Sequence, residues 1–140
     1  MTITKADAEA IVAEPKVITQ NLAWRQMRSR ARRYRLDAAV LIPGRDELAR
    51  LSASVNRDNF GFALLYANQP IRKAHIHFQH RNPDGEHITG PHKHTWDETF
   101  EDEWAYVPTE IDWTDANRAL LTFLKECNIE FKGTYKPFMV

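Results

Sequence analysis

All six histidines of this 140-residue chain lie between positions 75 and 94. Four of them form two His-x-His pairs, His75 with His77 and His92 with His94. Imidazole gains and loses a proton near neutral pH, and its neutral form is a common metal ligand. Side chains two apart on a strand point to the same face. If the segment between the pairs folds back beside a strand, four imidazoles meet.

Imidazoles with positive charges nearby are suited to cleaving RNA without a metal. A base removes the proton of the 2′-hydroxyl, an acid protonates the leaving 5′-oxygen, and a cation stabilises the charged phosphorus centre. The predicted acid/base set is His75, His77, His92 and His94. The predicted substrate-binding residues are Arg72, Arg81, Lys93 and Asp84. On this hypothesis the protein is a ribonuclease, its partner is RNA, and no cofactor is needed.

Two alternatives remain open for the same histidines. In the first, the two pairs hold a divalent metal such as zinc, in a metal-binding protein or a metal-dependent hydrolase. The neighbouring Lys and Arg side chains slightly disfavour this alternative, because like charges weaken metal binding. The absence of the HExxH motif excludes a helical zinc protease. In the second, the protein is a non-enzymatic interaction module, such as a phage inhibitor or a toxin–antitoxin partner. Its histidines are then structural, and its partner is a cognate protein.

A second cluster lies upstream, where residues 24–35 (WRQMRSRARRYR) hold six arginines. Arginine binds phosphate through a planar fork of donors, and aromatic rings stack on unpaired bases. The predicted nucleic-acid-binding residues are Trp24, Arg28, Arg30, Arg32, Arg33 and Tyr34. The alternative is a solvated face paired with the acidic residues of 97–103.

The two halves of the chain carry opposite net charges. Residues 1–73 carry 13 Lys and Arg against seven Asp and Glu, whereas residues 74–140 carry six against 12. The net charge of zero argues against strong non-specific binding to DNA. With 43% hydrophobic and 27% charged residues, the composition is that of a soluble globular domain. No apolar run can span a membrane, no secretory signal is recognisable, and the one cysteine excludes an internal disulfide. We therefore expect a cytoplasmic protein.

The hydrophobic pattern predicts an α+β fold, in which an antiparallel meander is packed by a C-terminal helix and preceded by an N-terminal helical arm. We expect one domain, with the arm, the basic segment and the first strand in residues 1–47 and the histidine-rich core in residues 48–140. Helices are predicted over 5–14, capped by Thr4, over 19–28, and over 114–128, capped by Asp112 or Thr114. Strands are predicted within 32–42, 48–55, 60–67 and 71–79. A loop is predicted over 81–94, with a turn at Pro-Asp-Gly and a very short strand over 87–89.

Four short motifs carry a resemblance to known proteins. They are Leu64–Tyr66, His80–Gly85, Gly90–His94 and Phe123–Ile129. The segment from about Leu48 to Ile129 resembles small, poorly characterised bacterial proteins with an HRNPDG and GPHxH pattern. The PHKH element is also similar to the histidine-rich segment of TumE-like toxins of toxin–antitoxin modules. The resemblance implies a bacterial or phage origin and a toxin-like role, with His80, Asp84, His92 and His94 as candidate positions.

Overall fold

The computed structural model describes residues 2–28, 33–56, 59–76, 79–108 and 115–139. The helices are α1 (Lys5–Ala13) and α2 (Ala116–Glu126). The strands are β1 (Lys16–Ile18), β2 (Leu22–Ala23), β3 (Arg25–Gln26), β4 (Arg33–Val40), β5 (Ala49–Asn56), β6 (Asn59–Tyr66), β7 (Gln69–His75), β8 (His80–Arg81), β9 (His87–Ile88), β10 (His92–Asp97), β11 (Glu101–Tyr106), β12 (Ile129–Phe131) and β13 (Tyr135–Lys136).

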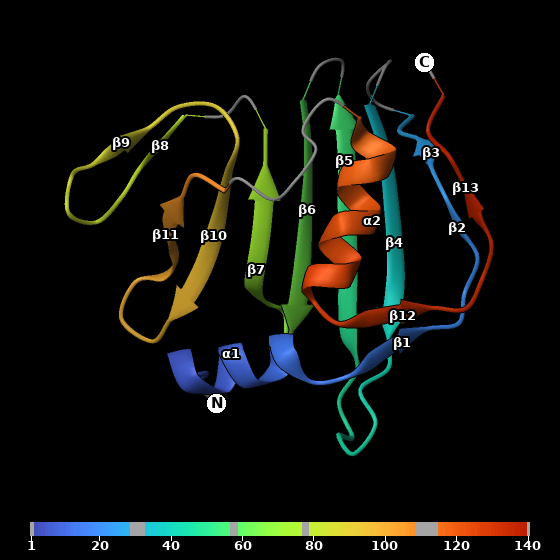
Figure 1. Ribbon diagram of the computed structural model, residues 1–140, viewed down its shortest axis with the longest axis horizontal. Coiled ribbons are helices and arrows are strands. Elements are labelled where there is room, and N and C mark those ends of the chain that lie inside the picture. The colour runs from blue at the N-terminus through green and yellow to red at the C-terminus, as the bar shows by residue number, and fades with distance from the viewer. Residues whose placement is uncertain (1, 29–32, 57–58, 77–78, 109–114, 140) are drawn as a thin grey trace.

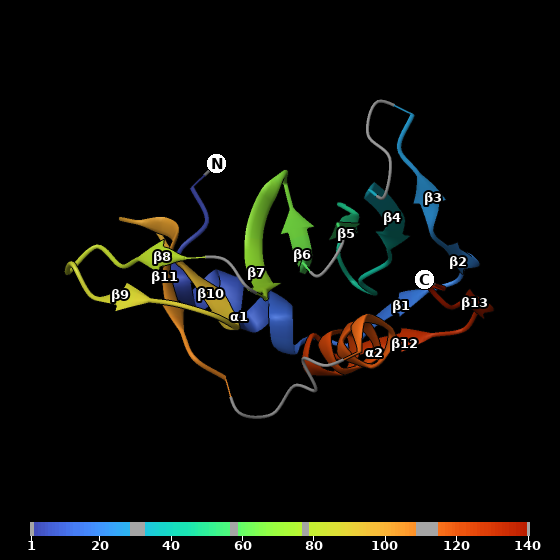
Figure 2. The same ribbon diagram turned by 90° about the horizontal axis from the view of Figure 1, so that it is seen from above.

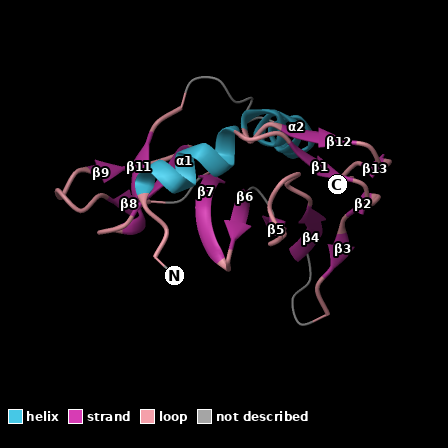
Figure 3. Cartoon of the chain, turned by 90° about the horizontal axis from the view of Figure 1, so that it is seen from below, coloured by secondary structure: helices cyan, strands magenta, loops and turns pink. Residues whose placement is uncertain are grey.

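A seven-stranded antiparallel sheet forms the centre of the molecule, in the order β11-β10-β7-β6-β5-β4-β3 (Figure 1). Strands β4 to β7 are the predicted meander, and β10 returns to pair with β7. Both helices lie on the same side of the sheet (Figures 2 and 3). The α+β class is therefore confirmed, and neither of the two helices in the described residues covers the other face of the sheet.

The sheet buries its helix-side face because apolar and polar residues alternate along its strands. On β5 the predicted core set Leu51, Ala53 and Val55 is buried, while the intervening side chains reach the other face. The pattern continues across the sheet, and Phe62 of β6 packs against Phe123 of α2 with ring centroids 5.8 Å apart. Burial of such rings supplies much of the driving force for folding.

The two helices begin at side-chain caps. The Thr4 hydroxyl accepts a hydrogen bond from the Asp7 amide, and the Asp7 carboxylate accepts one from the Thr4 amide, so the predicted cap of α1 is confirmed. Asp115 caps α2 by accepting from the amide of Asn117 at 2.8 Å. The caps predicted for α2, Asp112 and Thr114, lie outside the described residues. The apolar stripe of α2 ends in Cys127, which is fully buried in the core as predicted.

The helix predicted over 19–28 is wrong. The segment instead forms the short strands β2 and β3, because Leu22 pairs with Tyr135 near the C-terminus and Arg25 pairs with Arg35 of β4. Within the loop predicted over 81–94, the Pro-Asp-Gly turn and the very short strand over 87–89 are confirmed by the β8–β9 hairpin. Residues 92–94 belong to β10, so the loop ends earlier than predicted. Among the described residues, no helix is both long and apolar enough to cross a membrane.

Candidate functional site

Strands β7 and β10 bring histidines of the two predicted pairs together. Residue 92 lies directly opposite residue 75 in the antiparallel register, and His94 lies opposite Lys73. The side chains of His75, His92 and His94 therefore share one face of the sheet, the face without helices. His77 lies outside the described residues.

A fourth imidazole joins this group from the β8–β9 hairpin. The ring centroid of His80 lies 4.6 Å from that of His94 and 5.7 Å from that of His92. The His75 centroid lies 5.7 Å and 5.4 Å from the same two rings, and His92 and His94 are 4.9 Å apart. We call His75, His80, His92 and His94 the histidine cluster.

Backbone carbonyls orient three of these rings. Nδ1 of His92 lies 2.8 Å from the Gly90 oxygen, and Nδ1 of His94 lies 2.7 Å from the Asp102 oxygen. Nε2 of His80 bonds to the oxygen of Glu103. A carbonyl oxygen can only accept, so each of these ring nitrogens carries the proton. In a neutral ring, the other nitrogen then holds a lone pair.

Burial keeps the imidazoles of His75, His92 and His94 neutral at pH 7. It lowers the pKa of His75 to about 3, with a further contribution from the charge of Lys73. Burial also lowers the pKa of His94 to about 4 and lowers that of His92. His92 and His94 are only 1% and 5% exposed, whereas His75 and His80 are partly exposed. The cluster thus has two rings at its surface and two beneath them.

A buried asparagine, which sequence reasoning missed, ties the hairpin to the sheet. The Asn82 side chain donates to the carbonyl oxygen of Ala105 at 2.9 Å and accepts from its amide at 2.8 Å, so it occupies both backbone groups of one β11 residue. The Pro83–Gly85 turn then reverses the chain, with Gly85 at a φ of 92°. This attachment carries His80 to the cluster. An asparagine just before a Pro-Asp-Gly turn reads as a loop residue, so its burial was hidden.

Gly61 of β6 makes room for His75 and was also missed. A Cβ atom at position 61 would lie 2.6 Å from Nδ1 of the His75 ring, which is closer than side chains approach one another. Residues 61 and 75 are directly paired across the two strands. The missing side chain therefore lets the imidazole lie against the backbone of β6.

The predicted phosphate-binding cations do not join the cluster. Arg72 and Lys93 alternate with the histidines along their strands, so they point to the helix side of the sheet. Arg72 bonds both carboxylate oxygens of Glu9 at 3.0 Å, and Lys93, which is fully buried, bonds the carboxylate of Glu126. These two cations therefore hold α1 and α2 against the sheet.

The other two predicted substrate-binding residues lie on the hairpin. Arg81 of β8 is exposed. The Asp84 carboxylate accepts from the amide of Glu86 at 3.0 Å and so stabilises the turn. Lys73 lies on the same face as the cluster and next to it in register, and its ammonium lies 2.6 Å from the Asp102 carboxylate.

The predicted nucleic-acid-binding residues differ in their exposure and contacts. Arg30 and Arg32 lie outside the described residues, Arg28 is exposed, and Arg33 is half-buried at the start of β4. The Trp24 and Tyr34 rings both pack edge to face on Phe138, with centroids 5.9 Å and 5.0 Å away. This contact with the C-terminal segment occupies the two rings that were predicted to stack on bases.

A family model matches most of the chain. It matches residues 3–129 and describes a family of unknown function, DUF6978. The chain belongs to this family. The matched region includes α1, the complete seven-stranded sheet and the histidine cluster. No curated protein and no solved structure matches the chain.

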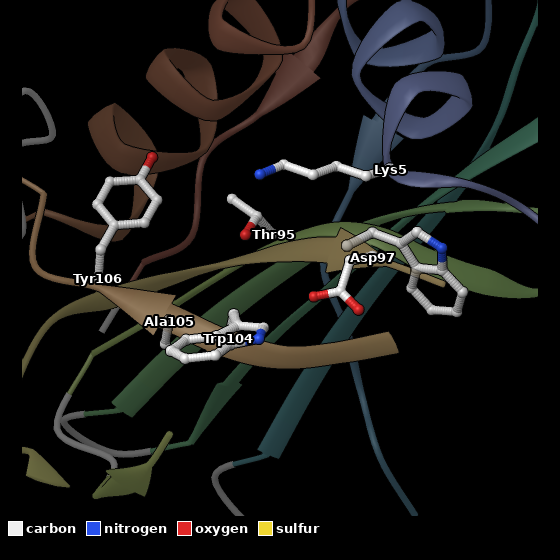
Figure 4. Close-up of a pocket in the computed structure, with 7 residues that line it drawn as sticks. Lys5, Thr95, Asp97, Trp104, Ala105 and Tyr106 are labelled. Carbon is white, nitrogen blue, oxygen red and sulfur yellow. The ribbon is translucent and has the colours of Figure 1, made fainter. Parts of the chain in front are cut away.

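This DUF6978 member also has a cavity on the helix side of β10 and β11. Its volume is about 300 Å³, and Lys5 extends toward Thr95 within it, near Trp104 and Tyr106 (Figure 4). No described residue of its lining is a histidine. The cavity is therefore separate from the cluster.

The described side chains do not form a ready-made metal centre. Within residues 2–28, 33–56, 59–76, 79–108 and 115–139, no three of the His, Cys, Asp and Glu side chains are arranged to hold a metal ion. The alternative prediction of a zinc site at His75, His77, His92 and His94 thus gains no support from the described members of that set.

Proposed function

We propose that the protein cleaves RNA and that the histidine cluster transfers the protons. One observation carries the proposal: four imidazoles from β7, β8 and β10 lie together on the sheet face opposite α1 and α2. The similarity of the PHKH element to TumE-like toxins supports a toxin-like role, with a cognate antitoxin as the protein partner.

The two partly exposed rings suit the two proton transfers. His75 is neutral at pH 7 and, because its Nδ1 is buried against Gly61, it accepts the proton of the ribose 2′-hydroxyl through Nε2. The 2′-oxygen attacks phosphorus and the bond from phosphorus to the 5′-oxygen breaks, leaving a 2′,3′-cyclic phosphate. His80 gives a proton to the departing 5′-oxygen. Lys73, on the same face, stabilises the added negative charge.

The buried rings act as positioning groups. His92 and His94 contact both surface histidines, and backbone carbonyls fix their orientation. They hold the two proton-transfer groups apart and reduce the water around them. Placement of this kind contributes to catalysis because the reacting groups need no rearrangement.

A cleavage assay in EDTA tests the proposal. The substrate is a short labelled RNA, and its all-deoxy analogue is the substrate control, since it lacks the 2′-nucleophile. We expect wild type to release 2′,3′-cyclic phosphate ends and His75→Gln and His80→Gln to lose at least about 100-fold in rate. The matched control is His87→Gln, which changes an exposed histidine of the same hairpin.

Three results would contradict the proposal. They are no cleavage by wild type, equal rates for wild type and His75→Gln, and cleavage of the deoxy analogue. Activity that disappears in EDTA and returns with zinc would replace the acid/base mechanism with a metal-dependent one. Elemental analysis of untagged protein would then show about one metal ion per chain.

A further inference from the structure

Three arginines surround one carboxylate on the uncovered sheet face. The guanidinium nitrogens of Arg25, Arg35 and Arg50 lie 3.2, 3.5 and 3.8 Å from the oxygens of Asp37. These distances are longer than those of tight charge-assisted bonds, which are about 2.7–2.9 Å. Three positive charges share one negative charge, so the group carries an excess of two. We call Arg25, Arg35, Arg50 and Asp37 the arginine group.

This excess remains available to a ligand. Arg25 and Arg50 are exposed, with side chains 71% and 58% accessible, and Arg35 is half-buried. Each guanidinium has five donors, of which the contact with Asp37 occupies few. The group is therefore complementary to a chain of phosphates, which offers more than one acceptor.

Strand pairing joins the arginine group to the histidine cluster in two straight rows. The first row runs through Arg35, Ser54, Gly61, His75 and His92, and the second through Asp37, Ser52, Ala63, Lys73 and His94. Adjacent strands are about 4.8 Å apart, so Arg35 and His75 are separated by about 14 Å. The residues between the arginine group and the histidine cluster in these rows are Gly, Ala and Ser, whose small side chains leave the surface shallow.

We infer that this face binds a single strand of RNA that lies across β4 to β10, with its phosphates on the arginine group and one phosphodiester at the histidine cluster. The inference rests on the proposed function and adds the binding surface and the form of the substrate. Successive phosphates of a stacked strand rise by about 3.4 Å, so about four nucleotides cover the distance between Arg35 and His75. We expect a single strand rather than a duplex, because the β8–β9 hairpin places the His80 ring against His92 and His94 on this face and so leaves less room for a paired strand.

A binding assay separates this inference from cleavage. The probe is a short fluorescein-labelled RNA with 2′-O-methyl groups, which cannot form the cyclic product, and binding is followed by anisotropy. For single strands the logarithm of affinity falls with the logarithm of salt with a slope of about 0.7 for each phosphate contact. Three arginine contacts therefore predict a slope of about −2. Losing one contact weakens binding about fivefold at 0.1 M salt.

We expect Arg35→Gln/Arg50→Gln to bind about 25-fold more weakly and to have a slope that is smaller by about 1.4. Arg25 remains in this variant as a partner for Asp37. The matched control is Arg118→Gln, because this exposed arginine lies on α2, on the other side of the sheet. A second variant, Ser54→Glu, places a negative charge between the arginine group and the histidine cluster and leaves the three arginines in place. We expect this variant to bind more weakly as well.

The inference is overturned if the double variant and Ser54→Glu bind within twofold of wild type, or if a duplex probe binds as tightly as the single strand. Failure of the proposed function looks different. In that case wild type does not cleave unmodified RNA, yet the 2′-O-methyl probe still binds with the predicted dependence on salt and arginine.

Discussion

Acidification should destabilise this protein through His75 and His94 of the histidine cluster. The ordinary histidine pKa of 6.5 applies to the unfolded chain, whereas in the folded protein the pKa is about 3 for His75 and about 4 for His94. Between these values the unfolded state binds more protons than the folded state. Stability therefore rises with pH in this window, and it is lost as the pH falls from 6.5 toward 4.

The size of the effect follows from the two pKa differences. At pH 5 an imidazole that is protonated only in the unfolded chain costs about 2 kcal/mol, so the two rings together remove about 4 kcal/mol relative to pH 7.5. A domain of this size has a total stability of about 5–15 kcal/mol. Near pH 5, each ring contributes a slope of about 1.4 kcal/mol per pH unit.

Urea unfolding at a series of pH values, in buffer with EDTA, measures this slope. His94→Gln removes one titrating group and should reduce the slope by about 1.4 kcal/mol per pH unit. His87→Gln removes an exposed histidine of the hairpin and should leave the slope unchanged. Equal slopes for these two variants would refute the reasoning, because the slope would then come from groups outside the cluster.

Three further outcomes are expected. Asn82→Ala leaves the edge of β11 without its two hydrogen bonds and should lower the free energy of unfolding by about 2 kcal/mol; an unchanged melting temperature would contradict it. Gly61→Ala displaces the His75 ring and should reduce RNA cleavage at least tenfold with little change in binding of the 2′-O-methyl probe, whereas full activity would show that the ring adjusts. Glu126→Gln leaves the ammonium of Lys93 buried without its carboxylate and should cost about 3–5 kcal/mol, and adding Lys93→Met should recover much of this loss in the same melting experiment.

The fold could be predicted where the pattern of buried residues is local. Alternation in β5 and the apolar stripe of α2 identify their core faces without knowledge of their partners. The segment over 19–28 failed because β2 and β3 are short edge strands whose pairing depends on distant residues. Leu22 bonds to the segment that includes Tyr135, and nothing near position 22 indicates that partner.

Sequence reasoning named the histidines that lie together, but it did not say to which face of the sheet their charged neighbours point. The convergence of His75 with His92 and His94 depends on β10 pairing with β7, which two His-x-His pairs suggest but do not require. The alternation that puts these rings on one face also puts Arg72 and Lys93 on the other, so their placement was within reach of the same rule. The role of Asn82 was not, because its partner on β11 is 23 residues away.

The position of Lys93 between His92 and His94 also protects the fold against mispairing. A slip of β10 by one residue would exchange the faces of all its side chains. Two imidazoles would then lie against the helices, and the ammonium that Glu126 neutralises would move to the opposite face. The buried ion pair between Lys93 and Glu126 thus favours the native register of β10, because the slipped sheet would lose it. Glu126 lies on the other side of the sheet from the histidine cluster, yet its identity helps to decide whether that cluster assembles.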